Sequence, residues 1–203
     1  MKGIRKKKSG ILPGYALFLL LLLTIVTEAA VAHDTLILAV HPYLPFSELQ
    51  KRFSPLAEYL GKETGSPVIV RVGSDYQEHI DAIGKNYVDI AYMGPASYVK
   101  MVEKYGGKPL LARLSINGSP HFKGFIITRK DSPFHSLADL KGRYFAFGDP
   151  NSTMSHLVPR FMLLEAGVQK NDLKGFEFLR SHNNVVLGVL SGDFDAGAIK
   201  EEV

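Results

Sequence analysis

Short strand-like segments alternate with helix-like ones from residue 36 onward, and this alternation limits the possible folds. The strand-like runs are apolar and rich in β-branched or aromatic residues, at 36–40, 67–72, 88–92, 110–116, 122–128, 144–147, 176–179 and 194–199. Helices are expected between them, at 54–61 or 54–65, and at 77–85, 96–105, 136–140, 153–166 and 183–190. Ser54-Pro55, a capping residue followed by a first-turn proline, is expected to begin the first of these. The pattern predicts an α/β fold with parallel sheets and ligands at the carboxyl ends of the strands.

The first 32 residues have the layout of a secretory signal peptide. Basic residues at 2 and 5–8 precede an apolar run at 15–26, and Ala30-Val31-Ala32 is a small-x-small cleavage site. The alternative is an uncleaved anchor helix, but the apolar run is short for a membrane span of roughly 20 residues. We therefore expect export, cleavage between Ala32 and His33, and a mature protein in the periplasm.

The excess positive charge of the chain belongs to this leader. Of 24 basic and 20 acidic residues, five basic and one acidic lie in residues 1–32, which leaves 19 of each in the remainder. A balanced charge gives no compositional support for nucleic-acid binding. The chain has no cysteine, which excludes disulfides and a thiol nucleophile. The seven histidines show no metal-ligand spacing, so neither a metal nor another cofactor is predicted.

Polar residues gather in the loops that follow the predicted strands. These loops carry His41-Pro42-Tyr43, Ser74-Asp75-Tyr76, residues 92–95, residues 148–153 and residues 180–183. Tyrosine, serine, threonine and histidine side chains donate neutral hydrogen bonds, which suit a small anion. His41 is interpreted as a loop residue rather than a ligand.

The most informative loop is Gly148-Asp149-Pro150-Asn151-Ser152-Thr153. It joins a predicted strand to a predicted helix, and the unpaired N–H groups and dipole of a first helical turn favour an anion. Asparagine, serine and threonine are also the usual capping residues. On this segment alone, an ordinary helix cap is the better interpretation.

Together these segments resemble the periplasmic phosphate-, phosphite- and phosphonate-binding proteins of ABC importers, the PhnD-like group. The matching segments run in family order at 52–60, 74–76, 88–94, 130–133, 137–142, 148–153, 181–182 and 189–198. D-P-N-S-T after a strand is the most specific of them. The resemblance implies a type II periplasmic-binding-protein fold whose two α/β lobes close on a ligand, here lobe 1 at 33–118 and lobe 2 at 119–203. It also implies further elements that complete the first lobe, so this chain is expected to be C-terminally truncated.

The resemblance further implies which residues bind the ligand. They are Tyr76, Tyr92, Ser152, Thr153, Met154, Ser155, His182 and Asp195. Met154 stands where the family usually has a third hydroxyl, with Ser155 one place later, although the backbone N–H of Met154 can still donate. Asp195, and more loosely Glu202, would hold a ligand amine. As alternatives, Tyr76 and Tyr92 could be packing residues, and His182 could cap the helix at Asn183.

The expected function is capture of phosphate, phosphite or a phosphonate and its delivery to an ABC permease, without catalysis. No triad partners and no G-x-S-x-G motif accompany Ser152, which disfavours a hydrolase. Two alternatives remain. One is a sensory module that reports the ligand to a membrane receptor or kinase, and the other is an exported enzyme acting on a phosphorylated small molecule. The sequence leaves the preferred oxyanion and the oligomeric state open.

Overall fold

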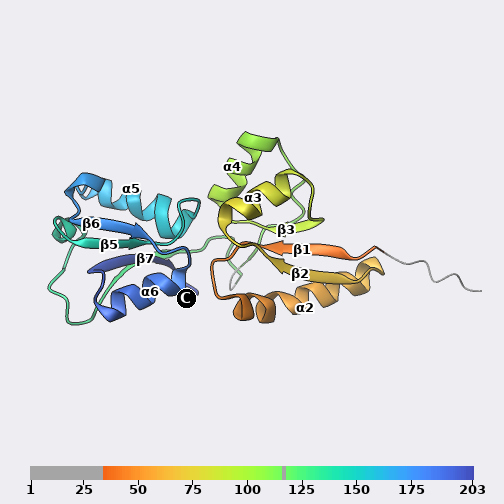
Figure 1. The fold of residues 1–203 in the computed structure, drawn as a ribbon, viewed down its shortest axis with the longest axis horizontal. Helices are drawn as coiled ribbons and strands as arrows, with labels where there is room; N and C mark the ends of the chain where they lie inside the picture. The colour runs from red at the N-terminus through yellow and green to blue at the C-terminus, as the bar shows by residue number, and fades with distance from the viewer. Residues whose placement is uncertain (1–33, 116–117) are drawn as a thin grey trace, which may run out of the picture. The chain divides into compact units, whose positions relative to one another are not determined.

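The computed structural model describes residues 34–115 and 118–203, within the unit Asp34–Val203. The predicted signal peptide and its cleavage site lie outside the described residues. Two separate sheets organise this unit (Figure 1). Among the described residues, none of the helices combines the length and the apolar character that crossing a membrane requires.

The first sheet consists of three parallel strands in the order β2-β1-β3: β1 (Leu36–Val40), β2 (Val68–Val72) and β3 (Ile90–Tyr92). Helices cover both faces of this sheet (Figure 1): α2 (Phe46–Thr64) on one, α3 (Tyr76–Gly84) and α4 (Pro95–Tyr105) on the other. In the strand register Val40 pairs with both Val72 and Tyr92. The carboxyl ends of all three strands therefore meet at one edge, as the alternating pattern predicted.

The second sheet has four strands in the order β4-β7-β5-β6: β4 (Gly124–Thr128), β5 (Tyr144–Phe147), β6 (Gly175–Phe178) and β7 (Ala196–Lys200). β5 pairs in parallel with β6 and β7, whereas β4 runs antiparallel to β7. The prediction of parallel sheets is therefore wrong for β4. The strand lies at the sheet edge, where either direction is compatible with the same apolar pattern.

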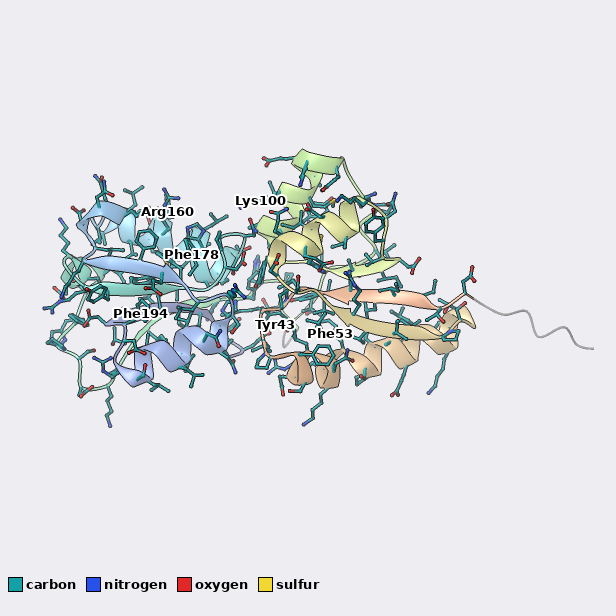
Figure 2. All side chains as sticks on the ribbon, in the orientation of Figure 1. Tyr43, Phe53, Lys100, Arg160, Phe178 and Phe194 are labelled. Carbon is teal, nitrogen blue, oxygen red and sulfur yellow. The ribbon has the colours of Figure 1, made fainter. Side chains whose placement is uncertain are left out.

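Helical segments surround the second sheet: η1 (Leu137–Leu140), the π-helical turn η2 (Thr153–Leu157), α5 (Val158–Glu165), η3 (Lys170–Asp172) and α6 (His182–Ser191). α5 covers one face and α6 the other (Figure 1). Phe178 packs in the core on the α5 side, with Leu163. Phe194 packs on the α6 side, with Val185 (Figure 2). Apolar side chains therefore pack on both faces of the sheet, and this packing holds β5 and β7 in place.

α2 begins eight residues earlier than Ser54, the predicted start. Pro55 lies inside the helix, and the hydroxyl of Ser54 donates to the carbonyl of Gln50 at 2.7 Å. Leu49 and Ala57 are both buried and lie eight residues apart, so one apolar face runs past the proline. Burial of that face outweighs the hydrogen bond that proline removes from the helix interior.

The predicted strand at 110–116 is wrong for its described part. Residues 110–115 adopt no regular structure, and Leu110, Leu111 and Leu114 are 68%, 78% and 56% exposed. Strand propensity needs a partner strand and a surface to pack on, and neither is encoded in the segment itself.

Candidate functional site

A cavity of about 360 Å³ collects most of the predicted site residues. Its volume lies within the usual range for small-molecule sites, about 300–1,000 Å³. Six of the eight predicted residues line it: Tyr76, Tyr92, Ser152, Thr153, Met154 and His182. Tyr92 is the last residue of β3, and the others come from the loops and helix starts that follow β2, β5 and β6 in the chain. Most residues of the cavity wall, meaning the residues that line the cavity, therefore lie at the carboxyl ends of strands, where ligand sites are expected to form.

Ser155 and Asp195 do not line this cavity. Ser155 is fully buried, and its hydroxyl has no hydrogen-bond partner among the described residues. Asp195 lies just before β7, where its Oδ2 accepts from the backbone N–H of Tyr144 at 2.9 Å. Lys200, at the other end of the same strand, lines the cavity. Asp195 therefore lies at the end of β7 away from the cavity.

Ser152 and Thr153 are placed by a tight turn in front of η2. The N–H of Ser152 donates to the carbonyl of Asp149 at 2.9 Å, and that of Asn151 donates to Asp149 Oδ1 at 2.7 Å. Ser152 then caps η2, because its Oγ accepts from the N–H of Ser155 at 3.2 Å. The capping interpretation of this loop is confirmed, and the capping residue lines the cavity as well.

The hydroxyl of Thr153 has one interaction already made. Its Oγ1 accepts from the backbone N–H of Ala96, at the start of α4, at 3.0 Å. A hydroxyl that accepts in this way still has its own hydrogen to donate. Thr153 lines the cavity, so that hydrogen is available to a bound acceptor.

His182 is a neutral donor on the wall. Its Nδ1 accepts from the backbone N–H of Lys200 at 2.9 Å, so the ring hydrogen of the neutral form resides on Nε2. Burial, reinforced by the charge of Lys200, lowers the pKa of His182 to about 4. The helix cap is Ser181, whose Oγ accepts from the N–H of Asn184. The alternative that His182 caps α6 is therefore wrong.

The tyrosines of the wall are both packing residues and donors. Tyr76 is 3% exposed and packs in a cluster with Val40 and Tyr43, which lies against Phe53 (Figure 2). Burial raises the pKa of Tyr43 and of Tyr92 to about 12, and raises that of Tyr76 too. All three phenols stay protonated near neutral pH and can donate to an anion.

His41 is a wall residue that the sequence reasoning dismissed. It follows β1 directly, is 6% exposed, and stacks on Tyr92 with ring centroids 5.2 Å apart and planes 13° apart. Burial, followed by the nearby His79, lowers the pKa of His41 well below its usual value. Its position at the carboxyl end of a strand was a usable signal. In the described ranges, no group of three or more His, Asp or Glu side chains is arranged to hold a metal ion.

Lys200 is the second wall residue that was missed. It is 7% exposed, its Nζ lies 3.0 Å from Glu202 Oε1, and it lies 5.4 Å from the ring centre of Tyr43. Arg113 adds a second cation to the wall, and within residues 34–115 and 118–203 no Asp or Glu lines the cavity. Glu202, suggested for a ligand amine, is paired with Lys200. The wall therefore combines positive charge with neutral donors, an arrangement that suits an anion.

The family described as "ABC transporter, phosphonate, periplasmic substrate-binding protein" matches residues 38–203. The chain is 33% identical over 175 residues to the phosphate-import protein PhnD of Mycolicibacterium smegmatis, and the match covers 81% of this chain and 54% of the relative. It is 32% identical over 139 residues to the phosphonates-binding periplasmic protein of Escherichia coli, covering 66% of this chain and 40% of the relative. The chain thus spans about half the length of the curated relatives it matches.

A solved structure shows the same fold. PhnD1 from Prochlorococcus marinus, in complex with methylphosphonate, superposes with a TM-score of 0.74 at 24% identity, covering 83% of this chain and 64% of that chain. The expected type II periplasmic-binding-protein fold is confirmed. With the sequence match over most of its length, the chain belongs to the family of periplasmic substrate-binding proteins of phosphonate ABC transporters.

Proposed function

We propose that this protein captures phosphate, phosphite or a simple phosphonate in the 360 Å³ cavity and delivers it to an ABC permease. The observation that carries the proposal is the composition of the wall. It presents Lys200, Arg113, hydroxyls and a neutral histidine donor, and it contains no carboxylate. The names of the relatives, a phosphate importer and a phosphonate-binding protein, support the same ligand class.

The donors of the wall fit the oxygens of a phosphoryl group. Thr153 can donate its hydroxyl hydrogen, His182 its Nε2–H, and the buried tyrosines their phenolic hydrogens. Hydrogen bonds to a charged group are worth about 1.5–3 kcal/mol each, and neutral donors bring no counter-charge that must also be desolvated. Three or four such bonds are sufficient for tight binding of a small oxyanion.

The wall also argues against a ligand that carries an amine. An ammonium group buried in the cavity would find no carboxylate among the described lining residues, and the nearby carboxylate of Glu202 is already paired with Lys200. An unpaired buried charge is costly. We therefore expect phosphate or methylphosphonate to bind more tightly than 2-aminoethylphosphonate.

Isothermal titration calorimetry of the mature protein tests the proposal. Phosphate, phosphite, methylphosphonate and 2-aminoethylphosphonate are titrated separately, and saturable heat with at least one of the first three is expected. No heat with any of the four would overturn the proposed function. Turnover of a phosphate ester that disappears in Ser152→Ala would instead support the enzymatic alternative.

A further inference from the structure

We propose that Nε2 of His41 accepts a hydrogen bond from the bound ligand, so that the cavity selects oxyanions that carry a proton on an oxygen. The inference rests on the proposed function and adds the protonation state of the ligand to it. It assigns a selecting role to a residue that packing alone would not require to be histidine.

The orientation of the His41 ring follows from its other nitrogen. Nδ1 lies 3.3 Å from the carbonyl oxygen of Tyr92, and a carbonyl oxygen only accepts. Nδ1 therefore carries the ring hydrogen of the neutral form. Nε2 is left with a lone pair, and no hydrogen bond within the described residues uses it.

The Nε2 side of the His41 ring lies beside Gly94, and both residues line the cavity. A Cβ placed on Gly94 would lie 4.0 Å from His41 Nε2 and 3.9 Å from Thr153 Oγ1. Because glycine has no side chain, the ring nitrogen and the threonine hydroxyl border the same part of the cavity. One oxygen of a bound ligand can therefore accept from Thr153 while a neighbouring oxygen of the same ligand donates to Nε2 of His41.

The surroundings of His41 keep its ring neutral. The groups facing it are Tyr43 beside its own loop, Tyr76 and His79 from α3, Tyr92 from β3, His182 from α6 and Lys200 from β7. His79, whose Nε2 shares the Tyr92 carbonyl at 3.0 Å, is itself buried. Lys200 is a cation, and the buried phenols remain uncharged. None of these groups is a carboxylate, so none of them stabilises the protonated, imidazolium form of His41.

The two cavity histidines therefore have opposite roles. The Lys200 N–H fixes His182 as a donor, and the Tyr92 carbonyl fixes His41 as an acceptor. Phosphate keeps a P–OH in both its singly and doubly charged forms. Methylphosphonate has a P–OH only when singly charged, and sulfate has none near neutral pH. A site with one obligatory acceptor distinguishes these three ions, because an unsatisfied polar group in a buried site is penalised.

Binding across pH tests this selection. Titrations of wild type with phosphate, methylphosphonate and sulfate are run from about pH 5.5 to about pH 9. Above the second pKa of methylphosphonate, its affinity relative to phosphate should fall about tenfold per pH unit, because one proton is bound with the ligand. The phosphate arm corrects for changes in protein charge across this range, because both ligands experience them alike. Sulfate should bind at least about tenfold more weakly than phosphate at every pH.

His41→Gln provides the matched variant, because an amide can turn either an acceptor or a donor toward the ligand. The pH slope for methylphosphonate should flatten, and the discrimination against sulfate should shrink. His182→Gln is the control, with lower affinity for both phosphorus ligands and an unchanged slope. The wild-type titrations test the selection for a protonated ligand oxygen even if His41→Gln does not fold.

The outcomes separate the two proposals. If no ion binds at any pH, the proposed function fails. If methylphosphonate binds with a pH-independent affinity relative to phosphate, or sulfate binds as tightly as phosphate, the role of His41 is overturned while the function stands. If the pH dependence of methylphosphonate affinity appears in wild type and is unchanged in His41→Gln, the ligand proton is accepted by another group. The assignment to His41 would then be wrong.

Discussion

Single side chains in this protein do two things at once. Thr153 Oγ1 accepts from Ala96 and has a hydrogen left for the cavity, while Ser152 both caps η2 and lines the wall. A residue used twice in this way is sensitive to small changes. Removing its oxygen affects the ligand and the protein together.

Thr153→Ala should weaken binding of the preferred oxyanion by about 1 kcal/mol or more, roughly fivefold in Kd. The loss has two sources, the missing donor and the unpaired N–H of Ala96. Calorimetry provides the measurement. Thr153→Ser should keep most of the affinity, and the exposed Thr64→Ala should match wild type. Unchanged affinity in Thr153→Ala would mean that the anion binds elsewhere.

Stability should fall as the solution is acidified below the usual histidine pKa of 6.5. Burial lowers the pKa of His79 and of His182 to about 4, so the unfolded chain takes up protons in this window that the folded chain does not. Each such histidine removes about 1 kcal/mol of unfolding free energy per pH unit, and the contribution is fully present above pH 6.5. Urea unfolding of wild type and His79→Gln checks this, since the variant should show a shallower slope. Equal slopes would contradict the burial of a neutral His79.

The D-P-N-S-T motif predicted the helix cap at Ser152, because capping depends on neighbouring residues in the chain. Tyr76, Tyr92 and His182 were placed on the wall by the family resemblance and not by a local motif. Lys200 and His41 were missed because they line the cavity only once loops distant in the sequence meet there. The sequence does not mark which end of β7 faces the cavity, and Asp195 lies at the end away from it.

At the scale of elements, the placement of η2 depends on close backbone contact. A Cβ on Gly148 would lie 2.2 Å from Ser155 Oγ, and the N–H of Gly148 donates to the carbonyl of Ser155 at 3.0 Å. The end of β5 and the first turn of η2 therefore lie directly against one another. The absence of a side chain at position 148 sets where Ser152 and Thr153 can be.

Gly148→Ala should displace η2 and so reduce both stability and ligand binding. Overpacking of this kind typically costs about 1–3 kcal/mol of unfolding free energy. Gly107→Ala is the matched control, because no atom lies within 4 Å of a Cβ at that position. Thermal unfolding and calorimetry measure the two effects. Wild-type affinity in Gly148→Ala would show that the position of η2 tolerates movement.

Most elements were predictable from the sequence because strand and helix periodicities differ. The exceptions had non-local causes. The start of α2 was hidden by Pro55, whose cost is outweighed by the face that buries Leu49 and Ala57. The direction of β4 was not encoded locally, and residues 110–115 had strand-like composition without a partner strand.

At the scale of the whole unit, hydrogen bonds connect the elements of the first sheet to those of the second. Besides Ala96 and Thr153, Ser97 Oγ donates to the carbonyl of Asn151 at 3.2 Å, and Lys100 Nζ donates to Asn151 Oδ1 at 2.5 Å. These contacts lie around the loop that lines the cavity. In a protein that closes on its ligand, contacts of this kind add to affinity without touching the ligand.

Lys100→Met should weaken phosphate and methylphosphonate binding by the same modest factor. A partly buried hydrogen bond of this kind contributes about 0.5–1.5 kcal/mol, up to roughly tenfold in Kd. Lys104→Met is the matched control on the same helix, because Lys104 pairs with Asp81 of α3 and not with the loop. Calorimetry with both ligands checks the prediction. A change in the ratio of the two affinities would indicate that Lys100 acts on the ligand itself.

Lys200, the last residue of β7, contributes two separate groups to the site. The hydrogen of Lys200 that fixes His182 belongs to the main chain, whereas the charge that faces the cavity belongs to the side chain. Any residue except proline supplies the same N–H. Replacement at position 200 can therefore change the charge of the pocket while His182 keeps its tautomer. One substitution at position 200 can thus alter ligand preference and leave the orientation of the His182 donor unchanged. Position 200 is therefore the first choice for changing the specificity of the site.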